Sequence, residues 1–179
     1  VMEDGSEVAY DPNDKTTIFI YKTTTEPQVG MVSYFKVLSG TIKPGDELIN
    51  ANNGEVERIS QLFVAEGKDR TPVAQLEAGD LGVTVKLKSG HTNNTLNSKG
   101  LSRKIRPMEF PESRVRKAVS AESSAETEKL FAALNKIKEE DPTLKVDIDH
   151  ETHEAILGGQ GQLHIDLVKQ RLEKEFGLK

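Results

Sequence analysis

The sequence predicts two domains in series, a small all-β barrel followed by an α+β domain. Residues 17–87 contain short β-rich runs separated by turn sequences, whereas residues 124–140 and 162–176 carry helical periodicity. A segment with prolines at positions 107 and 111 separates the two patterns. A chain of 179 residues is long enough to form two small domains.

Short strands and tight turns account for the first domain. Residues 17–21 and 29–37 are rich in β-branched and aromatic side chains, which favours two strands. The sequence Asn53-Gly54 predicts a two-residue hairpin turn whose partner strand covers residues 56–64. In that partner strand two sets of side chains alternate: Val56, Arg58 and Ser60 on one face, Glu57, Ile59 and Gln61 on the other. A turn at residues 78–80 then leads into a strand at residues 81–87.

The second domain mixes strands with two helices. A strand is expected at residues 115–119, and Ser123 and Glu126 have the spacing of a capping box at the start of the first helix. Asp141-Pro142 ends that helix, strands follow at 144–148 and 154–157, and the second helix covers 162–176. The order β-α-β-β-α is that of a ferredoxin-like split βαβ domain lacking its last strand. We therefore expect a piece of a longer protein.

These patterns give four segments. Residues 1–16 are expected to be an N-terminal linker, residues 17–108 the barrel, residues 109–112 a hinge, and residues 113–179 the α+β domain.

Composition restricts the class of protein. The absence of cysteine and of a 20-residue apolar run favours a cytoplasmic protein without a membrane partner. A net charge of −5 is unusual for a simple nucleic-acid binder, and no DNA partner is expected. No acidic residue lies between Asp80 and Glu109, however, and this stretch is suited to a phosphate backbone as well as to a solvated lysine face. The RNA-contact candidates are Lys86, Lys88, Lys99, Arg103, Lys104 and Arg106.

The most distinctive segment covers residues 155–166. An apolar run meets Gly158, Gly159 and Gly161 before the second helix begins, which predicts a strand, a tight turn and a helix. Such a turn suits either a phosphate or crowded packing. Its spacing matches neither the dinucleotide fingerprint nor the P-loop.

The run from Gly159 to Asp166 closely resembles the Gly-x-Gly-Glu-Leu-His-Leu-Asp segment in the third domain of elongation factor G. Further segments resemble that family in the same order: residues 29–40, 42–46, 78–80, 108–112 and 140–143. The resemblance covers residues 17–176. It implies a fragment of a translational GTPase that contains the second domain, a translation-factor-type barrel, and the third, ferredoxin-like domain.

By this resemblance the chain is a non-catalytic ribosome-binding and coupling fragment that acts in translocation. The barrel would contact small-subunit RNA, and the α+β domain would contact a ribosomal protein and the GTPase domain, relaying nucleotide state to distal domains. GTP and Mg²⁺ are expected in the missing GTPase domain, with no cofactor in this chain. The family's fusidic acid pocket would include Asp141, Thr143, Leu163, His164 and Arg171.

Other chemistry is weakly supported by the sequence. Asn135-Lys136-Ile137-Lys138 lacks the aspartate that reads guanine, and there is no P-loop, so the chain itself is not expected to be an enzyme. His150 and His153 lie on an expected polar turn, where alternate side chains diverge, so no metal is predicted.

Departures from the family include Gln162 in place of the usual glutamate, and they leave open a divergent paralogue. One alternative is a ribosomal-protection protein of the tetracycline-resistance type. Another is a stand-alone enzyme with a small-molecule site at residues 158–161.

Overall fold

The strands and helices separate into an all-β unit and an α+β unit. The computed structural model describes residues 1–26, 28–67, 69–121, 123–149, 151 and 154–178. Unit 1 covers Val1–Met108 and unit 2 covers Glu109–Lys179. The described part of unit 1 contains strands β1 to β10, and unit 2 contains three further strands and both helices. The predicted order of a barrel and an α+β domain is confirmed.

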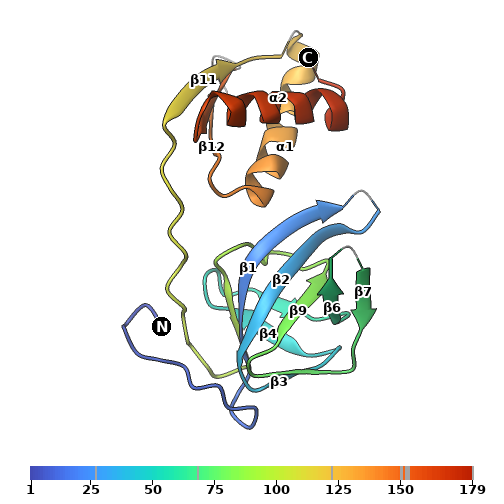
Figure 1. Ribbon diagram of the computed structural model, residues 1–179, viewed down its shortest axis with the longest axis vertical. Coiled ribbons are helices and arrows are strands. Elements are labelled where there is room, and N and C mark those ends of the chain that lie inside the picture. The colour runs from blue at the N-terminus through green and yellow to red at the C-terminus, as the bar shows by residue number, and fades with distance from the viewer. Residues whose placement is uncertain (27, 68, 122, 150, 152–153, 179) are drawn as a thin grey trace. The chain divides into compact units, whose positions relative to one another are not determined.

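Two long strands form the centre of the barrel. Strands β1 (Thr17–Glu26) and β2 (Gly30–Ser39) pair antiparallel, with irregularities between Thr17 and Ile18 and between Ile20 and Lys22. Such bulges bend a strand and increase its twist, as the curved β1 and β2 in Figure 1 show. They sit inside an eight-stranded sheet of order β5-β4-β10-β1-β2-β9-β6-β7.

The remaining barrel strands are short. They are β4 (Glu47–Asn50), β5 (Val56–Arg58), β6 (Phe63–Glu66), β7 (Asp69–Pro72), β9 (Leu81–Val85) and β10 (Thr95–Asn97), with β3 (Thr41–Ile42) paired to β8 (Leu76–Glu77). Apolar side chains from β1, β2, four of the short strands and the segments between strands form one core: Ile18, Ile20, Phe35, Val37, Ile42, Leu48, Ile59, Leu62, Leu76, Leu87 and Leu96.

The expectation of one strand across residues 56–64 is wrong. Strand β5 ends at Arg58 and pairs with β4, whereas β6 begins at Phe63 and pairs with β7 and β9. Ile59 and Leu62 lie in the break and are buried in the core. The chain therefore changes pairing partner within the break, and burial of these two side chains stabilises the irregular backbone between the strands.

The hairpin at Asn53-Gly54 exists, but its loop is longer than the two residues predicted. Ile49 pairs with Val56, the amide of Asn50 donates to Glu55 O, and the amide of Gly54 donates to Asn50 O. Gly54 has a φ of +79°, which glycine adopts without strain. Strands β7 and β10 were not predicted either, because they are short and polar.

Unit 2 is a three-stranded antiparallel sheet with its helices on one face (Figure 1). Its elements are β11 (Val115–Val119), α1 (Ser124–Glu140), β12 (Lys145–Asp149), β13 (Glu154–Gly159) and α2 (Gln162–Phe176). Ala155 and Leu157 of β13 are buried in one core with apolar residues of both helices, while Ile156 between them is 44% exposed on the other face. The sheet order β11-β13-β12 is the predicted split βαβ arrangement without a fourth strand.

The helices end where their sequences indicate. Asp141 follows α1 in an extended conformation, and Gly177 follows α2 with a φ of +63°. The amide of Leu178 donates to Leu172 O, and Leu178 is buried, which is the usual hydrophobic contact of a Schellman ending. The capping box predicted for α1 is not formed, because the Ser123 hydroxyl bonds the Glu126 carboxylate at 3.3 Å and caps no backbone amide.

Residues 1–16, expected to be a linker, bond to the barrel. Met2 forms a bridge with Ile105, and the Thr41 hydroxyl donates to Pro12 O. The Arg103 guanidinium also binds this segment, since it contacts Asp14 Oδ2 at 2.7 Å as well as Ser39 Oγ of β2 at 2.8 Å.

We predict that Arg103→Ala lowers the free energy of unfolding of the barrel by about 1–3 kcal/mol, because it removes partly buried, charge-assisted hydrogen bonds. The control is Lys104→Ala. The Lys104–Glu3 pair is 42% and 45% exposed, so its loss is expected to cost less than about 1 kcal/mol. Urea denaturation followed by circular dichroism measures both. Equal, small effects would contradict a structural role for Arg103.

Candidate functional site

The end of α1 and the start of α2 meet through Asp141. This residue forms a turn in which Oδ1 accepts the Thr143 amide at 2.9 Å and the Thr143 hydroxyl at 2.5 Å. Its other oxygen, Oδ2, lies 2.9 Å from Nε2 of His164 in the first turn of α2. Burial raises the pKa of Asp141, but the bonds from Thr143 and the contact with His164 outweigh it and lower that pKa below its ordinary 3.8.

The hydrogen bond that Nδ1 of His164 accepts determines the tautomer of the neutral ring. The amide of Gln160 donates to His164 Nδ1 at 3.1 Å, so in the neutral ring the proton resides on Nε2 and is donated to Asp141. The side-chain amide of Gln160 donates in turn to Pro111 O at 3.2 Å and Glu112 O at 3.1 Å. Through Gln160, the network reaches the segment expected to be a hinge.

Arg171 makes a second connection between the helices. Its Nη2 lies 2.7 Å from Glu140 Oε2 at the end of α1, and its Nε lies 2.9 Å from Glu175 Oε1 on α2. Hydrogen bonds to Glu175 and Glu140 outweigh burial and raise the pKa of Arg171, so the guanidinium stays charged. Because Glu140 precedes Asp141, both networks stabilise the same end of α1.

The five predicted pocket residues therefore divide into three groups. Thr143 and His164 are each hydrogen-bonded to Asp141, and Arg171 belongs to the neighbouring ion pair. Leu163 is an apolar side chain outside both networks and is 72% exposed. Leu167, one turn further on and 51% exposed, was not singled out from the sequence. Its spacing of four residues from Leu163 was the available signal.

Packing explains two of the three glycines before α2. A Cβ on Gly158 would lie 2.6 Å from Ser113 Oγ and 3.1 Å from Lys145 Cβ, and a Cβ on Gly159 would lie 3.2 Å from the His164 ring. Gly161 has open space around it. The geometry thus gives no support to a small-molecule site at residues 158–161.

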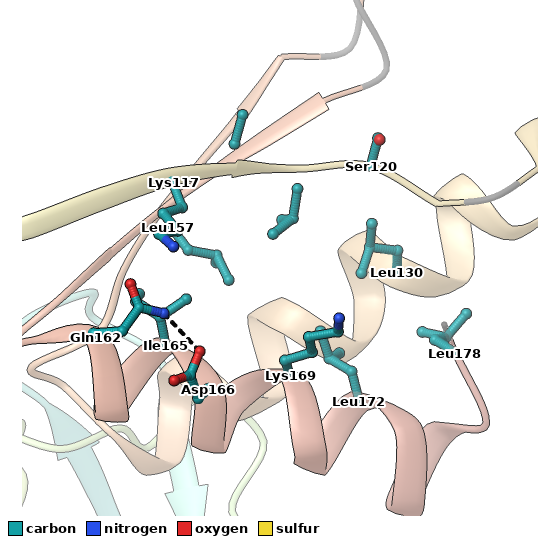
Figure 2. Close-up of a pocket in the computed structure, with 12 residues that line it drawn as sticks. Lys117, Ser120, Leu130, Leu157, Gln162, Ile165, Asp166, Lys169, Leu172 and Leu178 are labelled. Atoms are coloured by element: carbon teal, nitrogen blue, oxygen red, sulfur yellow. Dashed lines mark hydrogen bonds between the residues drawn. The ribbon is translucent and has the colours of Figure 1, made fainter.

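A hollow of about 420 Å³ lies beneath β11, separate from the Asp141 network. Figure 2 shows Leu157, Ile165 and Leu172 around it, with Lys117 and Lys169 also lining it and Gln162 bonded to Asp166 at 2.6 Å. Among the described strands β11 pairs only with β13, so the hollow follows an unpaired edge.

The six candidate RNA contacts of the barrel differ in their surroundings. Arg103 is bound to Asp14, and Lys104 lies 3.3 Å from Glu3. The other four are exposed, and within the described part of the chain none of them has an ion pair with a carboxylate: Lys86, Lys88, Lys99 and Arg106.

Strand register separates the two ends of this basic stretch. Val85, just before Lys86, pairs with Val32, which pairs with Thr24 of β1. Asn97, just before Lys99, pairs with Thr17 at the other end of β1. The seven residue-to-residue steps from Thr17 to Thr24 correspond to about 23 Å of extended chain. The basic stretch is therefore distributed along the barrel and is not one tight cluster.

The described helices provide no membrane span, and the described residues form no metal centre. Neither of the helices in the described ranges is long and apolar enough to span a bilayer. Those same ranges contain no group of three or more His, Cys, Asp or Glu side chains arranged for a metal ion. His150 and His153 lie outside the described residues.

We predict an acid-dependent loss of stability in unit 2 that is traceable to Asp141. Because its folded pKa lies below 3.8, Asp141 stabilises the fold above that pH, and its contribution is lost as the pH falls through the folded pKa. Asp141→Asn removes this part of the pH dependence. Thermal unfolding across pH 2–6 measures it, with the exposed Asp147→Asn as control. An unchanged profile in Asp141→Asn would contradict the assignment.

A second prediction concerns the glycines. Gly158→Ala is expected to lower the free energy of unfolding by about 1–3 kcal/mol, because its Cβ would overlap Ser113. Gly161→Ala, which meets open space, is expected to change it by less than about 0.5 kcal/mol. Chemical denaturation of both variants tests the packing explanation, and a tolerated Gly158→Ala would refute it.

Comparison with known proteins assigns both units. The family model described as "Elongation factor Tu domain 2" matches residues 30–97, and the model described as "Elongation Factor G, domain III" matches residues 110–179. A solved structure from Thermus thermophilus has a TM-score of 0.77 and 30% identity, and the match covers 93% of this chain and 25% of that one.

Curated relatives match the chain across both units. Elongation factor G of Thermotoga maritima is 37% identical and that of Thermotoga neapolitana 35% identical, each over 99% of this chain. The chain spans about a quarter of the length of these relatives, 26% in each case. With both matches present in order, the chain is elongation factor G-like and corresponds to the second, barrel domain and the third, ferredoxin-like domain of these relatives.

Proposed function

We propose that this chain is the non-catalytic, ribosome-binding and coupling part of an elongation factor G-type GTPase that acts in translocation. The observation that carries the proposal is the identity of 35–37% to elongation factor G over 99% of the chain, through both domains. Two domains of different architecture in the same order are improbable matches by chance, whereas a match to either one alone would fit many proteins.

In this proposal the barrel binds the phosphate backbone of small-subunit ribosomal RNA. The exposed cations that have no carboxylate partner in the described part of the chain carry the attraction, namely Lys86, Lys88, Lys99 and Arg106. Arg103 and Lys104 remain candidate contacts, but their ion pairs with Asp14 and Glu3 would have to open first. The net charge of −5 disfavours a general attraction to RNA, so the position of these cations orients the domain.

The α+β domain transmits the state of the GTPase domain. Asp141, His164 and Arg171 join the end of α1 to α2, so the two helices move together. Leu163 and Leu167 give α2 an exposed apolar face suited to a neighbouring domain or a ribosomal protein. A fusidic acid-type pocket would form there only when such a neighbour covers Leu163, because Thr143 and His164 already occupy both carboxylate oxygens of Asp141.

The GTPase reaction, with its GTP and Mg²⁺, belongs in this proposal to a separate domain of the parent protein, in the cytoplasm. No P-loop sequence occurs in this chain. Both Thermotoga relatives are named elongation factor G, which favours a translocation factor over a ribosomal-protection protein.

The proposal predicts salt-dependent binding to ribosomes. Replacing Lys86, Lys88, Lys99 and Arg106 together by alanine should weaken co-sedimentation of the 179-residue chain with small ribosomal subunits. The slope of log affinity against log salt should become shallower by about 3 units, because four phosphate contacts no longer release counterions.

The control variant removes two positive charges that lie outside the assigned surface. Lys43 lies on an exposed turn and Lys129 on the exposed face of α1, so Lys43→Ala with Lys129→Ala should leave the slope unchanged. A loss of slope in this control about half as large as that in the fourfold variant would mean that binding follows net charge alone, and the assigned surface would be wrong.

A further inference from the structure

One carboxylate in the barrel is buried and bound by backbone and hydroxyl donors. Glu57 of β5 is 1% exposed and lies on the same face as the core residue Ile59, as their alternation in the sequence indicated. Its Oε2 accepts the Lys88 amide at 2.9 Å, and its Oε1 accepts the Ser89 amide at 2.6 Å and the Ser89 hydroxyl at 2.8 Å. Burying a charge in this way is costly unless such bonds compensate it.

The backbone that Glu57 holds is the loop carrying two of the exposed cations. Lys86 has a φ of +60°, an uncommon conformation for a residue with a side chain, and its amide donates to Met31 O at 3.0 Å. Leu87 is buried in the core between the exposed Lys86 and Lys88. The loop is therefore fixed from β2 on one side of Leu87 and from Glu57 on the other.

Behind this loop the packing leaves little space for another arrangement. A Cβ on Gly90 would lie 2.6 Å from Leu87 Cδ1 and 3.1 Å from Ile20 Cδ1. The side-chain amide of Asn50 donates to Ser89 O at 3.2 Å, so Ser89 is bonded at its amide, its hydroxyl and its carbonyl. Within this loop the exposed side chains of Lys86 and Lys88 keep their freedom to move while their backbone is held.

We propose that Glu57 is a positioning residue, which fixes residues 86–89 so that Lys86 and Lys88 bind successive phosphates of an RNA backbone. The inference rests on the proposed function of the barrel. A loop fixed before binding loses less conformational entropy on binding than a mobile one, which raises affinity without a new contact.

Charge and position predict opposite effects for this residue. If Glu57 acted only through its negative charge, removing that charge would make the loop more attractive to phosphate and tighten binding. If Glu57 acts by position, Glu57→Gln weakens binding, because the new NH₂ group faces the Lys88 or Ser89 amide and one of these loses its acceptor. The sign of the effect separates the two roles.

The experiment measures binding of the 179-residue chain to purified small ribosomal subunits across a salt series. We expect Glu57→Gln to weaken binding about 3- to 10-fold, and Lys86→Ala with Lys88→Ala to make the log–log salt slope shallower by about 1.5 units. In the triple variant Glu57→Gln should cause no further loss, because its effect passes through the two lysines. Glu55→Gln, a nearby exposed residue, is the charge-matched control and should bind as tightly as the wild type or more tightly.

The outcomes separate the inference from the function on which it rests. If the double variant Lys86→Ala with Lys88→Ala binds as tightly as the wild type, both the RNA contact at this loop and the positioning role of Glu57 are overturned. Weakened binding by that variant, together with tighter binding by Glu57→Gln or an additive loss in the triple variant, would overturn the positioning alone.

A spectroscopic measurement guards against a purely structural effect. Glu57→Gln should shift the amide proton resonances of Lys88 and Ser89, whereas Lys86→Ala with Lys88→Ala should leave that of Ser89 in place. Where Glu57→Gln fails to fold, Ser89→Ala removes a single bond to Glu57 and should reproduce a smaller loss of binding, again absent when both lysines are alanine. A loss from Ser89→Ala that persists in full without the two lysines would contradict the inference.

Discussion

Backbone segments of the barrel that belong to no strand are held by side-chain hydrogen bonds, and the placement of its exposed cations depends on this constraint. A buried amide or carbonyl without a partner is costly, so irregular chain inside a barrel needs side-chain donors and acceptors. Asn97 Nδ2 donates to Arg103 O at 2.7 Å, Thr95 Oγ1 accepts the Ile105 amide at 3.0 Å, and Asn93 Oδ1 accepts the Met108 amide at 2.8 Å. The partners follow in reverse order, so segment 103–108 lies antiparallel to residues 93–97. These bonds fix the position of Arg106 on the barrel.

Side-chain hydrogen bonds also join the two helices of the α+β domain. Asp141 and Glu140 at the end of α1 bond His164 and Arg171 of α2. A displacement of α1 must therefore move α2 or break charge-assisted bonds, which is the mechanical property that a coupling domain needs.

Much of this fold could be predicted because its local patterns agree with its global structure. The helix bounds at residues 124–140 and 162–176 follow from apolar spacing, Asp141-Pro142 and Gly177, and β1, β2 and β9 follow from β-branched runs. Strands β7 and β10 escaped prediction because Asp69–Pro72 and Thr95–Asn97 have no apolar alternation of their own. They are strands because neighbouring strands offer them backbone partners, which is a non-local cause.

By itself the sequence determined the order of the two domains, most of the core, and the proximity of His164 to the glycine turn, since these depend on residues close together in the chain. Only the tertiary structure decided which charges are free. Arg103 and Lys86 look alike as basic residues in one acid-free stretch, yet Arg103 is bound to Asp14, 89 positions away in sequence, whereas Lys86 faces solvent. Likewise Glu57 acquires its partners 31 and 32 residues further along the chain. Ion pairs and buried hydrogen bonds form between groups that folding brings together, so no local pattern in the sequence specifies them.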